Sequence, residues 1–355
     1  MPVPPPRITL PARLLVALVA VVALVAPACE LVIAPSDPPP TAPPRTGDDP
    51  SDTDPPTPGQ DTDKPEIPEM GALAGAYVHP RPEPVKATEQ ALWSRREADA
   101  GRTYDIGHTF YSFTKEFPTW RESWHASEGR IPMVSWGQAS TSQVDDGAYD
   151  ELIRTRARAL RDLDTPVFLR WMAEMDGHAK APLAESPAMF TAAWRHIHAL
   201  FQQEGADNVA FVWCPNSWTY DVSPALASQW YPGGDTVDWV CADGYNWAPA
   251  RGEWTSFEQV FASFYGWAVT TGKPIMIGEF GAQERAPGEK AAWIRSIGTT
   301  LRTSFPEVKA IVYFDENKYE NGTNYDWRLD ATPASYAAWN YLLNDPYLNS
   351  RSGAR

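Results

Sequence analysis

The chain has 355 residues, of which 43% are hydrophobic and 16 are tryptophans, so it can bury the core of a large domain. Its formal net charge is −15, and no stretch is rich in lysine and arginine. Nucleic-acid-binding proteins and proteins held to an anionic membrane by charge need a basic surface, so the composition excludes both classes. A neutral substrate fits better.

The N-terminus has the features of an export signal. Arg7 and Arg13 precede an apolar run over residues 14–28 that is short for a membrane span, which predicts a signal peptide over residues 1–29. The run ends Ala26-Pro27-Ala28-Cys29, which is similar to the processing box of bacterial lipoproteins. We therefore expect lipid on Cys29 and an extracellular or surface location, anchored to a bacterial membrane. Simple secretion and an uncleaved anchor are the alternatives.

We place a linker over residues 30–69, of which residues 35–69 are rich in proline, aspartate and threonine and nearly free of apolar side chains. Such a segment cannot bury enough surface to offset its ordering entropy, so we predict a disordered linker with polyproline II character. The globular domain is then expected over residues 70–348, followed by a tail over residues 349–355.

From residue 71 onward, short apolar runs alternate with helical stretches, which is typical of βα units and a parallel sheet. Eight such units over this length predict a (β/α)8 TIM barrel in the α/β class. An open doubly wound sheet is the alternative, but no glycine-rich phosphate loop follows the first strand. The predicted strands cover residues 72–79, 104–113, 131–136, 167–174, 209–216, 237–245, 274–279 and 308–315. The predicted helices include residues 149–163, 187–204, 257–271, 289–302 and 333–343.

Two cysteines, Cys214 and Cys241, fall on the consecutive fifth and sixth predicted strands. A disulfide between them is possible in an oxidising compartment. We favour two buried free thiols, because neighbouring barrel strands seldom offer disulfide geometry.

Two apolar runs, residues 168–174 and 273–279, each end on a glutamate, Glu174 and Glu279. The carboxyl ends of barrel strands form the active site of TIM-barrel enzymes, so the two carboxyl groups should face each other across the barrel mouth. Glycoside hydrolysis with retention needs such a pair, one as acid and one as nucleophile.

Four segments in chain order make the prediction specific. They are Arg170-x-x-Ala173-Glu174-Met175-Asp176-Gly177, Trp213-Cys214-Pro215-Asn216, Asp243-Gly244-Tyr245 with the preceding Tyr231-Pro232-Gly233, and Lys273-Pro274-Ile275 to Glu279-Phe280-Gly281. Together these segments resemble glycoside hydrolase family 26, whose best-known members are endo-β-1,4-mannanases with a (β/α)8 fold and a retaining mechanism.

The resemblance implies that Glu174 is the general acid/base and Glu279 the nucleophile, and that Tyr245 donates a hydrogen bond to the nucleophile. A negative charge on Glu279 disfavours a second one on Glu174, which would keep Glu174 protonated and able to donate. Arg170 lies on the same strand face and should be the positively charged neighbour, or else part of a structural salt bridge.

Sugar rings pack on aromatic faces, so we expect substrate contacts from aromatic residues at strand ends. The predicted substrate-binding residues, besides Arg170 and Tyr245, are His108, Trp136, Trp171, Trp213, Asn216, Trp247 and Phe314. For His108 and for each aromatic residue a purely structural role is the alternative.

Three positions depart from the family pattern: Ala173 replaces a histidine, Asp176 an asparagine and Phe314 a tryptophan. The departures concern the cleavage subsite and bear on mannan specificity more than on the reaction type. From the resemblance we expect a monomeric endo-β-glycanase acting on β-1,4-mannan. The alternatives are mixed-linkage glucan, xylan or an exopolysaccharide as substrate, or a barrel that binds polysaccharide without cleaving it. We expect no cofactor and no nucleic-acid partner, and we interpret the oxygen-rich residues 315–326 as a cleft loop rather than a metal site.

Overall fold

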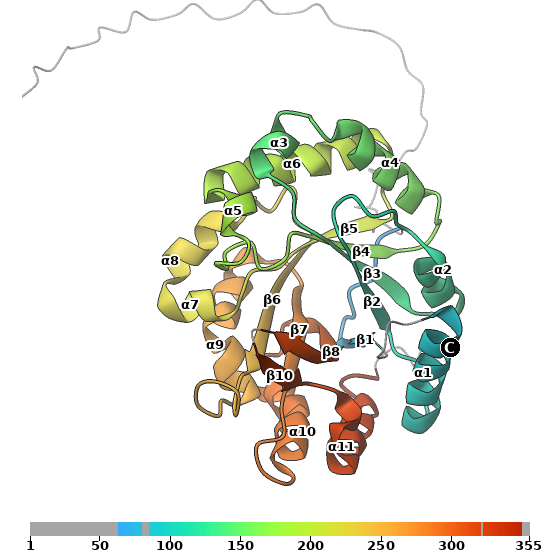
Figure 1. Ribbon diagram of the computed structural model, residues 1–355, viewed down its shortest axis with the longest axis vertical. Coiled ribbons are helices and arrows are strands. Elements are labelled where there is room, and N and C mark those ends of the chain that lie inside the picture. Colours follow the sequence, from blue (N-terminus) through green and yellow to red (C-terminus); the bar gives the residue numbers. More distant parts are fainter. Residues whose placement is uncertain (1–62, 80–84, 321, 350–355) are drawn as a thin grey trace, which may run out of the picture. The chain divides into compact units, whose positions relative to one another are not determined.

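The computed structural model describes residues 63–79, 85–320 and 322–349. Eight parallel strands close into a barrel in sequence order, with β8 hydrogen-bonded back to β1 (Figure 1). The strands are β1 (Leu73–Val78), β2 (Ile106–Tyr111), β3 (Ile131–Trp136), β4 (Val167–Trp171), β5 (Val209–Trp213), β6 (Trp239–Asn246), β7 (Ile275–Ala282) and β8 (Val308–Asp315). The barrel prediction is confirmed, and the closed sheet excludes the open doubly wound alternative.

Helices surround the strands, as Figure 1 shows for the elements it labels. They are α1 (Lys86–Ala100), α2 (Trp120–Ser127), α3 (Thr141–Asp145), α4 (Asp150–Arg161), α5 (Ala181–Ala184), α6 (Pro187–Gln203), α7 (Trp218–Val222), α8 (Pro224–Ala227), η1 (Ser228–Trp230), α9 (Phe257–Ala268), η2 (Val269–Thr271), α10 (Glu289–Thr303), η3 (Leu329–Ala331) and α11 (Pro333–Leu343). Local sequence sets where they begin. At α9, for example, the Ser256 side chain accepts from the Gln259 amide while Gln259 accepts from the Ser256 amide, a capping box.

Strand alternation divides the buried side chains into two sets. One fills the barrel interior and includes Phe168, Val212, Trp239 and Met276. The other packs between the strands and the helices. Because successive residues point to opposite sides of the sheet, the parity of a residue along a regular strand decides whether it can reach the barrel mouth. In β7 the register shifts between Ile277 and Phe280, so Gly278 and Glu279 both face the interior.

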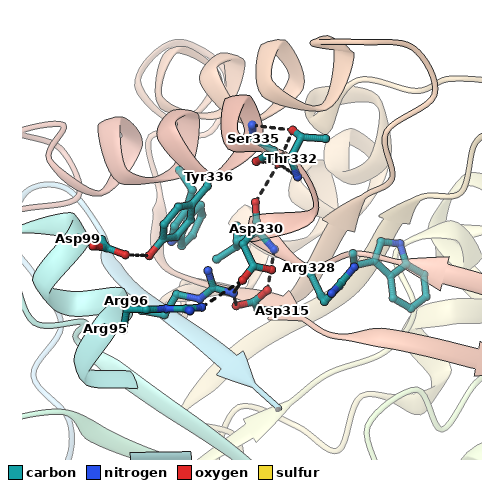
Figure 2. Close-up of polar contacts among 12 residues, drawn as sticks. Arg95, Arg96, Asp99, Asp315, Arg328, Asp330, Thr332, Ser335 and Tyr336 are labelled. Carbon is teal, nitrogen blue, oxygen red and sulfur yellow. Dashed lines mark hydrogen bonds and ion pairs between the residues drawn. The ribbon is translucent and has the colours of Figure 1, made fainter. Parts of the chain in front are cut away.

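A hairpin follows β8, where the sequence predicts only a long loop. Strands β9 (Asn317–Glu320) and β10 (Thr323–Asp326) pair antiparallel. The chain returning from this hairpin is held by buried charge: Arg96 of α1 lies 2.9 Å from Asp315 and 3.1 Å from Asp330 (Figure 2). The Arg96 guanidinium also lies under the Tyr336 ring, so α1, β8, η3 and α11 are joined at one point.

The last residues of the predicted linker, 63–69, contact the barrel. Lys64 donates a hydrogen bond of 2.9 Å to Asp238, and the Lys309 ammonium reaches the Glu69 carbonyl oxygen, so residues 63–69 pack on the barrel. The signal peptide, Cys29 and the rest of the linker lie outside the described residues, as does all of the tail except Asn349. Within the described ranges, none of the helices is long and apolar enough to cross a membrane.

Candidate active site

The two predicted catalytic glutamates lie at the carboxyl ends of their strands. Glu279 is inside β7 and 9% exposed, and Glu174 follows β4 after a sharp change in backbone direction. Both Met172 and Glu174 have positive φ, 46° and 59°, a region that costs non-glycine residues about 1 kcal/mol or more. The Glu174 amide donates to the Cys214 carbonyl oxygen at 2.8 Å, which holds this turn against the next strand.

Arg170 is the centre of the site and is fully buried. One of its terminal nitrogens lies 2.7 Å from both carboxylate oxygens of Asp243, and the other donates to Glu279 Oε1. Tyr245 donates its hydroxyl to Glu279 Oε2 at 2.6 Å. Each oxygen of Glu279 therefore accepts a hydrogen bond from a fixed donor, an arrangement that orients a carboxylate for attack.

The surroundings of Glu174 favour the protonated form of its carboxyl group. Burial and then the charge of Glu279 raise the pKa of Glu174 to about 7, against the opposing charges of Lys180 and Arg170. Burial and the Glu279 charge also raise the pKa of Tyr245 well above its usual value, so its hydroxyl stays protonated as a donor. Glu174 can thus carry a proton near neutral pH beside a negatively charged neighbour.

His108 is buried and does not reach the barrel mouth, contrary to the predicted sugar contact. Ser135 Oγ accepts from Arg170 Nε at 2.8 Å and shares a second hydrogen bond, of 2.7 Å, with His108 Nε2. Burial and the charge of Arg170 lower the pKa of His108 well below its usual value, which keeps the ring neutral. Two residues further along β2, Phe110 is 41% exposed and its ring lies 5.6 Å from the Arg170 guanidinium, so Phe110 rather than His108 is accessible here.

The prediction of sugar contacts is wrong for three tryptophans, because each is at most 1% exposed: Trp136, Trp171 and Trp213. Each is the last residue of its strand, β3, β4 or β5, and alternates with an inward-pointing neighbour, so it points toward the helices. Trp171, next to the inward Arg170, stacks on Phe190 of α6.

The remaining predicted contacts lie near the mouth. Phe314 and Tyr245 are 8% and 9% exposed and belong to one aromatic cluster with Trp327, against which half-buried Tyr77 and Trp247 pack. Arg251 covers one face of the Trp247 ring at 3.6 Å. Tyr77, Phe110 and the part of Trp247 that stays open are therefore better placed for a sugar than the buried tryptophans.

Asn216 belongs to a polar network beside Glu174. Its backbone and side-chain nitrogens donate to Asp176 Oδ1 at 3.0 and 2.9 Å, and Thr219 donates to Asp176 Oδ2. Asp176, which departs from the family pattern, thus ties the turn after β4 to the start of α7. Ala173 packs its methyl group against the barrel interior.

Cys214 and Cys241 form a disulfide, so the prediction of free thiols is wrong. The two residues lie side by side on β5 and β6 with Cα atoms 4.3 Å apart, close enough for the bond that neighbouring barrel strands seldom allow. Together with Asp243 they are the one His/Cys/Asp/Glu group among the described residues whose ligand atoms lie close enough for a metal. The disulfide and the Arg170 contact occupy these atoms, which leaves no set of free ligands.

Sequence reasoning misses the role of Asp243, although the Asp-Gly-Tyr segment is part of the family resemblance. The available signal is parity: Cys241, Asp243 and Tyr245 alternate along one strand and so share the inward face. Ser135 and Phe110 give no comparable signal, because their importance depends on the position of Arg170 on another strand.

The comparisons with known proteins agree with this geometry. A family model described as Glycosyl hydrolase family 26 matches residues 143–281, which include Glu174 and Glu279. Endoglucanase H of Acetivibrio thermocellus is 31% identical over 282 residues, covering 76% of this chain and 30% of the relative. Beta-1,3-xylanase TXYA of a Vibrio species is 32% identical over 145 residues, 39% of this chain and 28% of the relative. The chain thus spans less than a third of either relative.

Solved structures share the fold at low sequence identity. The catalytic domain of a Bacillus sp. JAMB-750 endo-β-1,4-mannanase superposes with a TM-score of 0.58 at 15% identity, covering 80% of this chain and 89% of that one. A β-mannanase from Bacteroides ovatus superposes with a TM-score of 0.57, also at 15% identity, covering 79% of this chain and 90% of that one. These structures agree in fold, and the family model together with the relatives supports glycoside hydrolase family 26 as the family of this barrel.

Proposed function

We propose that the chain is a retaining endo-β-glycanase in which Glu279 is the nucleophile and Glu174 the general acid/base. The observation that carries the proposal is that the two carboxyl groups have different surroundings. Glu279 receives two fixed donors, Arg170 and Tyr245, whereas the pKa of Glu174 is raised to about 7. A nucleophile and a proton donor need these two states.

The reaction follows from this arrangement. Glu279 attacks the anomeric carbon while Glu174 gives its proton to the leaving glycosidic oxygen, so that a glycosyl ester forms on Glu279. The ester carries no negative charge, which removes one cause of the raised pKa of Glu174. Glu174 then ionises more readily and accepts a proton from the water that hydrolyses the ester. Arg170 stays buried against Asp243 and serves to hold Glu279 rather than to bind sugar.

For the substrate, we infer a β-glucan main chain ahead of β-1,4-mannan. The curated relatives are named an endoglucanase and a β-1,3-xylanase, and glucose and xylose both carry an equatorial 2-hydroxyl, whereas that of mannose is axial. Ala173 supports the same choice: it replaces the histidine that, in the family pattern, supports the acid/base glutamate and the region of the sugar's 2-hydroxyl. The mannanases share the fold at 15% identity, so mannan rests on the motif resemblance alone.

The test is hydrolysis of a panel of mixed-linkage β-glucan, carboxymethylcellulose, β-1,3-xylan, β-1,4-xylan and mannan, followed by new reducing ends. Glu174→Ala and Glu279→Ala should each abolish release, and Glu307→Ala, at an exposed position before β8, should not. Proton NMR of the first products should show the β-anomer if the configuration is retained. Near-wild-type turnover by Glu279→Ala would refute the catalytic assignment, and the α-anomer would refute retention.

A barrel that binds polysaccharide without cleaving it is the second candidate, and the replacement of the family histidine by Ala173 is the observation that favours it. An inert wild-type chain that is still retarded by one polymer in affinity electrophoresis would support this candidate. Glu279→Ala should then leave the retardation unchanged.

We also propose that the protein is exported and held at the cell surface by lipid on Cys29. The support is the sequence of the first 29 residues. Metabolic labelling with an alkyne fatty acid should mark the wild type and not Cys29→Ser. Equal labelling of both would refute the anchor.

A further inference from the structure

We propose that the Cys214–Cys241 disulfide positions the active site by holding the strand ends that carry the acid/base and the nucleophile in a fixed relation. This inference rests on the proposed hydrolase function. Both cysteines are fully buried and belong to the group of side chains that fills the barrel interior. The bond therefore lies beneath the catalytic carboxylates and not on the surface.

The disulfide joins β5 and β6 within the sheet. Strands β5 and β6 pair only at Val212 with Trp239 and at Trp213 with Val240, and the next contact is an isolated bridge between Asn216 and Asp243. Cys214 and Cys241 are the next pair in the same register and lie between these contacts. On the other side of β6 the register with β7 shifts between Ala242 and Asp243. Backbone hydrogen bonds resume above the cysteine pair, where the Asp243 amide donates to the Pro215 carbonyl oxygen and the Ser217 amide donates to the Asp243 carbonyl oxygen. The covalent bond therefore lies within a paired region of the sheet and adds a fixed link between β5 and β6 directly below the site.

On the acid/base side, the contact is through the backbone. The Cys214 carbonyl oxygen accepts the Glu174 amide at 2.8 Å, and Glu174 has a φ of 59°. A residue in this sparsely populated region keeps its conformation only where its surroundings determine it. The hydrogen bond to the Cys214 carbonyl oxygen holds Glu174 in this conformation, and the disulfide fixes Cys214 relative to β6.

On the nucleophile side, the contact is through side chains. Asp243 Oδ1 lies 3.2 Å from Cys214 Sγ, and Asp243 holds the Arg170 that donates to Glu279. Gly278, which directly precedes Glu279, packs so closely on the sulfur atoms that a Cβ there would lie 2.3 Å from Cys241 Sγ and 3.0 Å from Cys214 Sγ. One cross-link therefore contacts the supports of both catalytic groups.

Breaking the bond should slow chemistry more than binding. If the strand ends move apart, Glu174 and Glu279 leave their reactive separation, and misplacement by about 1 Å can cost up to about 100-fold in rate. The charge of Glu279 raises the pKa of Glu174, so a larger separation should lower it. Tyr77 and Phe110, the candidate sugar contacts, lie on β1 and β2, whereas the cysteines lie on β5 and β6, so KM should change little.

The experiment is a double-mutant cycle on the full chain with Cys214→Ser, Cys241→Ser and the double variant. Cystine should first be verified by peptide mapping of the native protein without reductant. Either single substitution breaks the same bond, so each should lower kcat on the preferred polymer about tenfold, and the double variant should be no slower than the singles. The alkaline limb of the pH–rate profile should move to lower pH in all three. Cys214→Ala/Cys241→Ala should behave like the serine pair, which excludes an effect of a buried hydroxyl.

Met276→Leu, a volume-conserving change in the same barrel interior, is the control for lost stability: it should lower Tm without moving the pH–rate profile. Assays are run below the Tm of every variant. Free thiols in the native protein, additive effects of the two serines, or unchanged kcat with only a lower Tm would each overturn the positioning role while leaving the hydrolase intact. A wild type that hydrolyses none of the polymers would overturn the proposed function and this inference with it.

Discussion

The raised pKa of Glu174 predicts the pH dependence of hydrolysis. Because the acid must be protonated to donate, kcat/KM should fall as pH rises through about 7. A group with that pKa is about nine-tenths protonated at pH 6 and about one-tenth at pH 8, so the rate should drop roughly tenfold between these values. Lys180 opposes the raised pKa with its positive charge. Its replacement in Lys180→Met should move the alkaline limb to higher pH.

The assay is the initial rate of reducing-end release at polymer concentrations well below KM, from pH 4 to 10. A polymer is needed because an activated aryl leaving group would hide the need for an acid. Lys115→Met, at an exposed position between β2 and α2, is the charge-matched control and should leave the limb in place. An alkaline limb above pH 9, or a limb that moves to lower pH in Lys180→Met, would refute the assignment of the acid.

Three further predictions concern residues that support the site. Tyr245→Phe removes the 2.6 Å hydrogen bond to Glu279 and should lower kcat about 10- to 100-fold, measured by steady-state kinetics; an unchanged kcat would contradict the role. Gly278→Ala places a methyl group within 2.3 Å of the Cys241 sulfur and should lower the free energy of unfolding by about 1–3 kcal/mol in urea titration. The control is Gly266→Ala, whose methyl group meets nothing within 4 Å and should not lower this free energy. Burial lowers the pKa of Lys290 to about 8, so between pH ~8 and ~10 the unfolded chain binds more protons than the folded chain. The free energy of unfolding should therefore rise over that window by up to about 3 kcal/mol. Urea titrations across this pH range should show the rise in the wild type and not in Lys290→Met.

The fold is predictable because its signals are local. All eight predicted strands are present, and the five predicted helices begin within one residue of their expected positions. An apolar run of five or six residues between helical stretches identifies a buried strand without any knowledge of its neighbours. The β9–β10 hairpin is not predictable in the same way, since its residues are polar and its position depends on buried charges such as Arg96 and Asp315, which come from opposite ends of the chain.

The site is only half predictable, and strand parity explains the difference. A glutamate near a strand end is identified as a candidate by its type and place: Glu279 lies inside β7, and Glu174 lies just after the end of β4. A tryptophan at a strand end is not identified as a sugar contact in the same way, because moving one residue along the strand turns the side chain from the barrel interior to the helix layer. Arg170 points inward, so Trp171 cannot, and the same logic removes Trp136 beside Ser135. Parity can be counted from the sequence once one residue of a strand is known to face the barrel interior. Counted from Arg170, it places Trp171 on the helix side, and counted from Tyr245, it places Asp243 and Cys241 in the interior. Pairs of residues across strands, such as Cys214 with Cys241, need the register as well, and register is a property of the closed barrel rather than of either strand.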